Sequence, residues 1–387
     1  MFSIHTALFL TIFCASVYHL IPQRWWSARL TLVCLTSFVL IFSLHPMAAI
    51  VALLCAILTW GIHKVGLTRP TVQKYAPFSL FLILAVFSLK DFSIESAPYS
   101  KAILNFGMSF YILRLYGSLR VARKKKVELK FLEFVTVTLF FPMFAAGPIA
   151  YYDSFRPHIE APFLISDWVY GLVRIGAGAF CLYFATGYID GLINDIVGAK
   201  FNAAPRWDKL SAWETYKVTM LKFFHLYMNF TGYTEIAIGC GSFFGFKLPE
   251  NFRFPFLSRN IQDFWKRWHL SLSSFITNHI YLPLVIKTGF KHPKISIFVA
   301  FVLIGLWHEI SWQYLFWGVG HGAALVCYQT VSKTKRWKAR STSVKNMCTI
   351  PGIVVTLSYV GFLSVFANEA TFGRSIEFMS ALFGFGV

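Results

Sequence analysis

The sequence predicts an all-α protein that crosses a membrane with about 11–12 helices. Of its 387 residues, 56% are hydrophobic and only 14% are charged, whereas soluble domains carry roughly 25% charged residues. The mean hydropathy is +0.58, and apolar runs that can cross a hydrocarbon core ~30 Å thick recur along the chain. No internal repeat, low-complexity tract or linker interrupts them, so we expect a single membrane domain over residues 1–387.

Each apolar run is expected to form one helix, with ends uncertain by a few residues. The first run, residues 2–21, has no basic residue before it, and the first arginine is Arg24. A secretory signal has a charged region at that place, so we expect a membrane helix there. The expected helices cover residues 3–21, 28–44, 47–62, 77–89, 102–118, 131–150, 168–190, 213–232, 233–246 (the last two forming either two helices or one broken helix), 295–310, 312–330 and 349–367.

The formal net charge of +19 is carried by clusters in the short gaps between apolar runs. This is where the positive-inside rule places basic residues, so we expect anionic lipid rather than nucleic acid as the partner of these charges. With the N-terminus outside, counting the spans puts every strong basic gap in the cytoplasm and residues 90–101 and 151–167 outside. We expect a multi-pass membrane protein. The strong basic gaps are residues 63–74, 114–130, 287–294 and 333–345.

Neither a disulfide framework nor a metal site is expected from the cysteines and histidines. The seven cysteines are scattered singly in apolar segments, and no C-x-x-C pair occurs. An H-E-x-x-H zinc motif starting at His308 would need histidine at position 312, which is Trp312.

Residues 248–284 match no spanning helix, because Pro249 and Pro255 interrupt the segment and it is rich in polar residues. From Ser258, a good N-cap, apolar residues recur at the spacing of an amphipathic helix, with His269 at the edge of the apolar stripe. One interpretation is a helix that lies on the membrane surface. The other is a re-entrant segment that forms the wall of a polar cavity. The polar groups that flank His269 favour the re-entrant segment.

The stretch "GLWHEISW", residues 305–312, places an imidazole and a carboxylate between two apolar runs. An ionisable residue at membrane depth predicts a functional site. A lone imidazole with a reference pKa of about 6.5 is suited to general-base work on a hydroxyl or to proton relay. The alternative for His308 is a structural imidazole that is hydrogen-bonded to a neighbouring helix. Glu309 follows it directly and points about 100° away on a helix, so we do not expect it to orient the imidazole.

Two stretches carry a resemblance to a known family. "MNFTGYTEIAIG" leads into "NFRFPFLSRNIQDFWKRWHLSLSSFITNHIYLPL", and "GLWHEISWQYLFWGVGHG" follows. Over residues 228–322 the chain resembles the membrane-bound O-acyltransferase family, in particular alginate-type polysaccharide O-acetyltransferases and teichoic acid D-alanyl transferases of bacteria. "FPMFAAGPIAYYDSF" at 141–155 is a weaker match.

The resemblance implies a tunnel across the bilayer and a catalytic role for His308, with His269 lining the same tunnel. Two positions depart from the family pattern: Glu309 replaces the usual glycine, and residues 276–279 replace a segment with Arg-Asp. Either His269 or Asn278 is a candidate donor to a developing oxyanion. The residues expected at the substrate site are Asn278, Trp265, Trp307 and Glu309.

The resemblance also implies a reaction. An acyl group, in the leading hypothesis acetyl, moves from a cytoplasmic donor such as acetyl-CoA or an acyl carrier thioester. It reaches a hydroxyl of an extracytoplasmic polysaccharide, directly or through a partner transferase. The donor is a substrate, and no tightly bound cofactor is expected.

Two alternative functions remain. One is a D-alanyl transferase fed by a small acidic carrier protein, which would dock on the basic gap 120–130. The other is a proton-coupled transporter, suggested by the helix break near 249–255 and the intramembrane histidines, although no internal repeat supports it.

Overall fold

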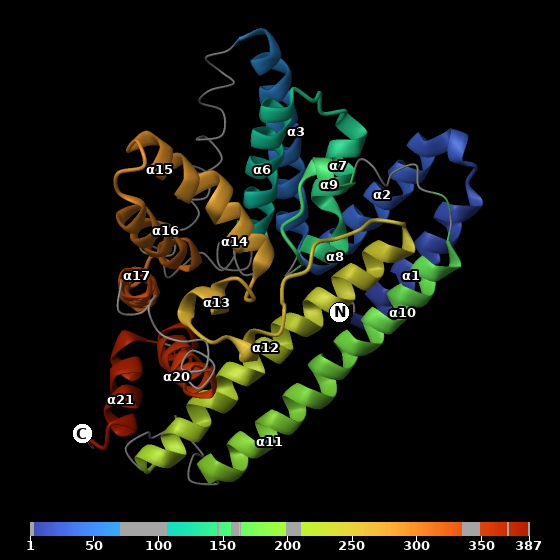
Figure 1. The fold of residues 1–387 in the computed structure, drawn as a ribbon. Coiled ribbons are helices and arrows are strands. Elements are labelled where there is room, and N and C mark those ends of the chain that lie inside the picture. The colour runs from blue at the N-terminus through green and yellow to red at the C-terminus, as the bar shows by residue number, and fades with distance from the viewer. Residues whose placement is uncertain are drawn as a thin grey trace. The chain divides into compact units, whose positions relative to one another are not determined.

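The computed structural model describes residues 4–69, 107–144, 147–155, 162, 164–198, 210–334, 349–369 and 371–385. Over this part of the chain every regular element is a helix, which confirms the all-α class (Figure 1). The expected helix 77–89 and the start of the expected helix 102–118 lie outside the described residues. The chain forms two compact units, residues 1–179 with 232–250 and residues 180–231 with 251–387. They are called the first and second unit here.

The first unit consists of helices, most of which are apolar. Their cluster of buried side chains includes Tyr18, Phe140, Phe155 and Phe243, which are far apart in the sequence. The helices are α1 (Ile4–Leu20), α2 (Trp26–Leu44), α3 (Pro46–Thr68), α6 (Ser109–Lys125), α7 (Phe131–Leu139), α8 (Phe141–Phe144), α9 (Tyr152–Phe155), α10 (Ile165–Ala179) and the last part of α12 (Ala212–Phe243).

Glycines let α10 approach α12 closely within this unit. A Cβ atom added to Gly171 would lie 2.8 Å from the main-chain oxygen of Gly239. Arg174 of α10 then forms ion pairs with Glu235 of α12 and with Glu250. Charges at membrane depth are costly unless they are paired, so this pairing offsets the cost of the three ionised groups.

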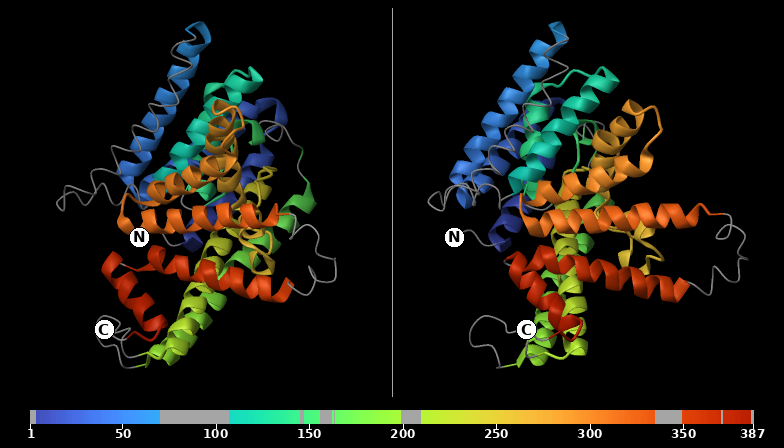
Figure 2. Two further views of the ribbon diagram at one scale, coloured as in Figure 1. Left: turned by 60° about the vertical axis from the view of Figure 1, so that its left-hand side comes forward. Right: turned by 90° about the vertical axis from the view of Figure 1, so that its left-hand side faces the viewer.

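The second unit is built mainly from the C-terminal helices. Helix α17 packs against α16 and α20, and Figure 2 shows α17 and α20 running side by side. The elements are the π-helix Phe180–Ala185, α11 (Thr186–Val197), the first part of α12, a 3₁₀ turn Pro255–Leu257, α13 (Ile261–Trp265), α14 (Leu270–Ile276), the π-helix Thr277–Tyr281, α15 (Leu282–Lys287), α16 (Pro293–His308), α17 (Trp312–Ser332), α20 (Thr349–Asn368) and α21 (Phe372–Leu382).

Four helical stretches among the described residues are long and apolar enough to span a membrane: 23–44, 46–68, 165–197 and 349–368. Two shorter apolar helices, 7–20 and 293–308, join them. These stretches agree with a polytopic membrane protein. Helix α21 was not predicted, because its sequence is only moderately apolar.

Two features change the expected topology. Helix α12 runs unbroken from Ala212 to Phe243, where the sequence allowed two spans. Lys125 also forms an ion pair with Asp153 at 2.7 Å, so both residues lie on the same side of the membrane. Assigning residues 114–130 and 151–167 to opposite sides was therefore wrong at Asp153, because α7 is a nine-residue helix and the chain turns back after it. With two crossings fewer, the same count of spans still predicts the cytoplasmic side for the basic gap 287–294.

The segment after Pro249 differs from the expected amphipathic helix. Asn260, not Ser258, caps its first helix, because the Asn260 Oδ1 accepts from the Asp263 N–H at 2.9 Å. Helix α13 has only five residues, and a break precedes α14. His269 lies at this break with φ of +46°, in the left-handed region. Whether the segment is re-entrant or lies on the membrane surface stays a prediction.

Candidate functional site

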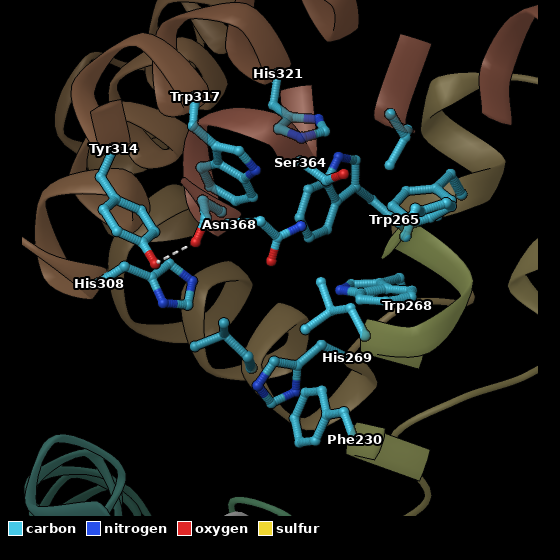
Figure 3. Close-up of a pocket in the computed structure, with 16 residues that line it drawn as sticks. Phe230, Trp265, Trp268, His269, His308, Tyr314, Trp317, His321, Ser364 and Asn368 are labelled. Atoms are coloured by element: carbon cyan, nitrogen blue, oxygen red, sulfur yellow. Dashed lines mark hydrogen bonds between the residues drawn. The ribbon is translucent and has the colours of Figure 1, made fainter. Parts of the chain in front are cut away.

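A cavity of about 240 Å³ lies within the second unit (Figure 3). Parts of the chain far apart in sequence contribute to its wall: α12, the broken segment α13–α14, the end of α16, α17 and α20. The lining residues are Phe223, Leu226, Phe230, Phe264, Trp265, Trp268, His269, Leu272, His308, Tyr314, Trp317, His321, Val360, Ser364, Ala367 and Asn368.

His308 enters the cavity because α16 ends at this residue. Glu309 takes an extended conformation with φ of −163°, and Ser311 caps α17 by accepting from the Tyr314 N–H. The side chain of His308 is exposed. Its ring stacks on Tyr314 with centroids 5.4 Å apart and meets Trp317 edge-on at 5.6 Å. The imidazole is therefore held by aromatic rings at an accessible position.

The turn after His308 is tight because glycines face each other across the α16–α17 hairpin. A Cβ atom at Gly305 would overlap the main-chain oxygen of Tyr314, and one at Gly318 would lie 2.6 Å from the oxygen of Phe301. Only glycine allows the two backbones to come this close. The same packing fixes His308, at the end of one helix, against the first turns of the other.

His269 enters the cavity by a different route. Its positive φ places it in a conformation that costs a non-glycine residue about 1–3 kcal/mol, which the surroundings must offset. Main-chain bonds hold the break: the Leu270 N–H donates to the Asn251 oxygen, and the Arg253 N–H donates to the Arg267 oxygen, both at 2.9 Å. The His269 side chain is only 4% exposed and lies edge-on to Phe230 at 4.7 Å.

A third histidine lines the cavity and was missed in the sequence. His321 of α17 is 1% exposed, with Trp317 at 4.5 Å and Trp265 at 5.0 Å from its ring centroid. Its Nδ1 atom has no hydrogen-bond partner in the described part of the chain. The signal that marked His308, an imidazole in an apolar helix, applies equally to His321 and would have found it.

Helix α20 contributes polar groups that no sequence signal marked. Asn368 is exposed and lines the cavity beside Ala367, whose main-chain oxygen accepts from the Tyr314 hydroxyl at 3.5 Å (Figure 3). Ser364 donates to the Gly361 oxygen of its own helix. These residues follow the conspicuous histidines by more than forty positions, so only the fold brings them to the site.

The described wall of this cavity is made of uncharged side chains and histidines. No Asp, Glu, Lys or Arg belongs to its described lining residues. Among the described residues, no group of three His, Cys, Asp or Glu side chains is arranged to hold a metal ion. The cavity offers imidazoles, indoles and neutral polar groups, a set suited to moving a proton and to contacting an uncharged group.

Comparison with known proteins identifies the family. The model of the membrane-bound O-acyltransferase family matches residues 9–365. The chain belongs to this family.

The chain is also similar to individual proteins, at 28–32% identity. The chain is 28% identical to a peptidoglycan O-acetyltransferase of Helicobacter pylori, over 66% of the chain and 47% of that protein. It is 32% identical to a teichoic acid D-alanyltransferase of Bacillus subtilis, over 58% of each. It is 28% identical to a probable alginate O-acetylase of Pseudomonas putida, over 64% of the chain and 50% of that protein. The chain thus spans about half the length of the curated relatives it matches.

The structure of this family member brings together only some of the expected site residues. His308, His269 and Trp265 line the cavity, whereas Asn278, Trp307 and Glu309 are absent from its lining. The roles of all six remain predictions.

The three expected residues that do not line the cavity are Asn278, Trp307 and Glu309, and each has other neighbours or faces outward. Asn278 is exposed and donates to the Ser274 Oγ atom at 3.3 Å. Trp307 lies beside the His308 ring at 4.6 Å. Glu309 is exposed beyond the end of α16. Asn278 was expected at the site because residues 276–279 depart from the family pattern, whereas its side chain bonds within its own segment.

Proposed function

We propose that this protein is an O-acyltransferase that moves an acetyl group from an activated thioester to a hydroxyl of an extracytoplasmic glycan, with His308 as the general base. The observation that carries the proposal is the meeting of His308 and His269 in one cavity. They come from separate elements of the second unit, and both were singled out from the sequence. A purely structural histidine pair would not need an accessible cavity between aromatic walls.

The proposed reaction needs one proton transfer at the attacking oxygen. The acceptor hydroxyl oxygen forms a bond to the thioester carbonyl carbon, while the carbon–sulfur bond breaks. His308 takes the hydroxyl proton as the bond forms and returns it to the leaving thiolate. General-base help of this kind contributes about 10²- to 10⁴-fold.

The uncharged wall of the cavity favours acetyl over D-alanyl. A D-alanyl group carries an ammonium, and a buried charge without a partner is costly. No carboxylate lines the cavity among the described residues. An acetyl group carries no charge and needs only apolar contact for its methyl group and donors for its carbonyl oxygen.

D-alanyl transfer is the second candidate because three tryptophans line the cavity: Trp265, Trp268 and Trp317. The face of an indole attracts a cation and can replace part of a missing carboxylate. The identity to a teichoic acid D-alanyltransferase supports the same candidate.

The proposed sidedness rests on the basic gaps. A donor, free or on a carrier protein, approaches from the cytoplasmic face, where "RKKK" at residues 123–126 attracts anionic groups. The acceptor glycan, or a partner transferase that passes the acyl group on, lies on the other face. The bilayer is that of a bacterial cytoplasmic membrane.

A donor comparison tests the proposal. The purified protein in lipid vesicles receives radiolabelled acetyl thioester or D-alanyl thioester, together with extracted cell-envelope glycan, and transfer is measured beside a His308→Ala variant. We expect label in the glycan from the acetyl donor and not from the variant. Transfer of D-alanyl alone would establish the second candidate, and equal transfer by protein and variant would contradict both.

A further inference from the structure

Asn251 contacts His269 through its side chain as well as its main chain. The His269 Nδ1 atom lies 3.3 Å from the Asn251 Oδ1 atom. The Ser271 hydroxyl donates to the same oxygen at 2.6 Å. Asn251 itself is completely buried. The side-chain oxygen of Asn251 thus contacts both His269 and Ser271 at the break between α13 and α14.

The chemistry of this oxygen fixes the proton on the imidazole. An amide oxygen only accepts hydrogen bonds, so the His269 Nδ1 atom must carry the hydrogen that points to it. A neutral imidazole has one N–H and one bare nitrogen, and the other nitrogen, Nε2, then holds a lone pair. The partner of one ring nitrogen sets the role of the other.

The backbone makes this contact rigid. The Asn251 main-chain oxygen accepts from the N–H of Leu270, the residue directly after His269. Asn251 is therefore held to the break by its main-chain oxygen, at Leu270, and by its side-chain oxygen, at His269 and Ser271. Turning this side chain away would break both hydrogen bonds of its oxygen at a fully buried position.

We propose that Asn251 is a positioning residue that fixes His269 as the Nδ1–H tautomer, so that His269 accepts a hydrogen bond from the acceptor hydroxyl through Nε2. This inference rests on the proposed function. It replaces the expectation that neutral His269 donates to the oxyanion, because a bare Nε2 has no hydrogen to give. His269 then holds the hydroxyl in place, while His308 removes its proton.

The tautomer is directly measurable by ¹⁵N NMR of histidine-labelled protein in lipid. The difference between wild type and His269→Gln isolates the two ring nitrogens of His269. We expect a protonated Nδ1 and a bare Nε2 in the neutral ring. A protonated Nε2 with a bare Nδ1 would overturn the inference, whatever the activity of the protein, so this result is independent of the proposed reaction.

Two substitutions at Asn251 add the functional test. Asn251→Leu removes the acceptor, and we expect loss of the Nδ1–H signal and a fall in kcat of about 10- to 100-fold, below the full range for a lost acid–base group. Asn251→Asp keeps an oxygen there and should retain the signal and more of the activity. Ser273→Ala is the matched control, because its hydroxyl donates to the main-chain oxygens of Trp265 and Trp268 in the same segment.

The results separate the inference from the general proposal. If Asn251→Leu is produced in folded form with the wild-type tautomer and the wild-type kcat, Asn251 has no positioning role. If both wild type and His308→Ala lack transfer while the tautomer is as expected, the proposed function fails and the structural part of the inference stands.

Discussion

The two regions that bring histidines into the cavity hold them in opposite ways. His308 lies at the end of a regular apolar helix, is exposed, and is contacted by the rings of Tyr314 and Trp317. His269 lies at a break between two short helices, is buried, and is bonded to Asn251. Aromatic contacts leave an imidazole able to change its protonation and adjust its ring, whereas a hydrogen bond to an amide fixes both.

This difference assigns different tasks to the two rings. A general base must gain and lose a proton in every turnover, which suits the accessible His308. A group that orients a hydroxyl works best when its own geometry is fixed in advance, which suits His269. The predictions below follow from this comparison.

The largest effect is expected at His308. His308→Ala should reduce kcat by about 10²- to 10⁴-fold, the range for loss of an acid–base group. The protein should still fold and insert, because removing a polar group from an apolar helix does not weaken insertion. Acyl transfer per mole of membrane-inserted protein is the measurement. Wild-type turnover by the variant would mean that this imidazole is structural.

A smaller loss is expected at His269. His269→Ala removes an orienting group but leaves the base, so kcat should fall by less than in His308→Ala, by about 10-fold to 100-fold. Both variants are assayed side by side at the same expression level. If His269→Ala loses more activity than His308→Ala, the two roles are exchanged.

The α16–α17 hairpin gives a stability prediction. Gly305→Ala adds a methyl group that overlaps the main-chain oxygen of Tyr314, and overpacking of this kind costs about 1–3 kcal/mol. Thermal unfolding of the purified protein in detergent should show a lower Tm. Gly191→Ala is the control, since among the described residues no atom beyond its chain neighbours and its own helix backbone lies within 4 Å of the added group. Equal Tm values for both variants would argue against tight packing of the hairpin.

Little change is expected at Glu309. Its side chain does not line the cavity and follows the end of α16. Glu309→Gly restores the residue usual in the family, and kcat and KM should stay within about threefold of wild type, as for a surface substitution. A large change in acceptor choice or in the pH profile would show that the carboxylate acts on the site.

Cysteine labelling can test on which side of the membrane residues 125 and 153 lie, without substituting a residue of the proposed site. Lys125 and Asp153 form an ion pair, so cysteines placed at 126 and at 153 should both resist an impermeant thiol reagent applied to intact cells. Reagents admitted by permeabilisation should label both. Labelling of position 153 from outside, with 126 protected, would restore the original assignment of opposite sides.

The sequence was sufficient where a single local pattern determines the structure. Apolar composition predicted the all-α membrane class, and helices such as Trp26–Leu44 and Pro293–His308 begin and end close to the expected positions. His308 was singled out because ionisable groups at membrane depth are rare, and His269 by its place at the edge of an apolar stripe and by the family resemblance. These predictions needed no knowledge of distant contacts.

Long-range contacts explain what the sequence could not predict. The break at His269 depends on bonds from residues 251 and 253, so helical periodicity alone continued the helix through it. The chain returns after α7 so that Asp153 meets Lys125 of α6, a contact between distant residues that no local pattern marks. Asn368 belongs to the cavity only because α20 packs against α17.

Chemical rescue of His308→Ala tests the central claim most directly. The variant is reconstituted in vesicles with labelled acetyl thioester and glycan acceptor, and transfer is measured while imidazole is added. The account predicts that the variant is nearly inactive alone and that transfer rises with imidazole concentration, because the small base replaces the missing side chain in the cavity. Transfer by His308→Ala at the wild-type rate without imidazole would contradict the account.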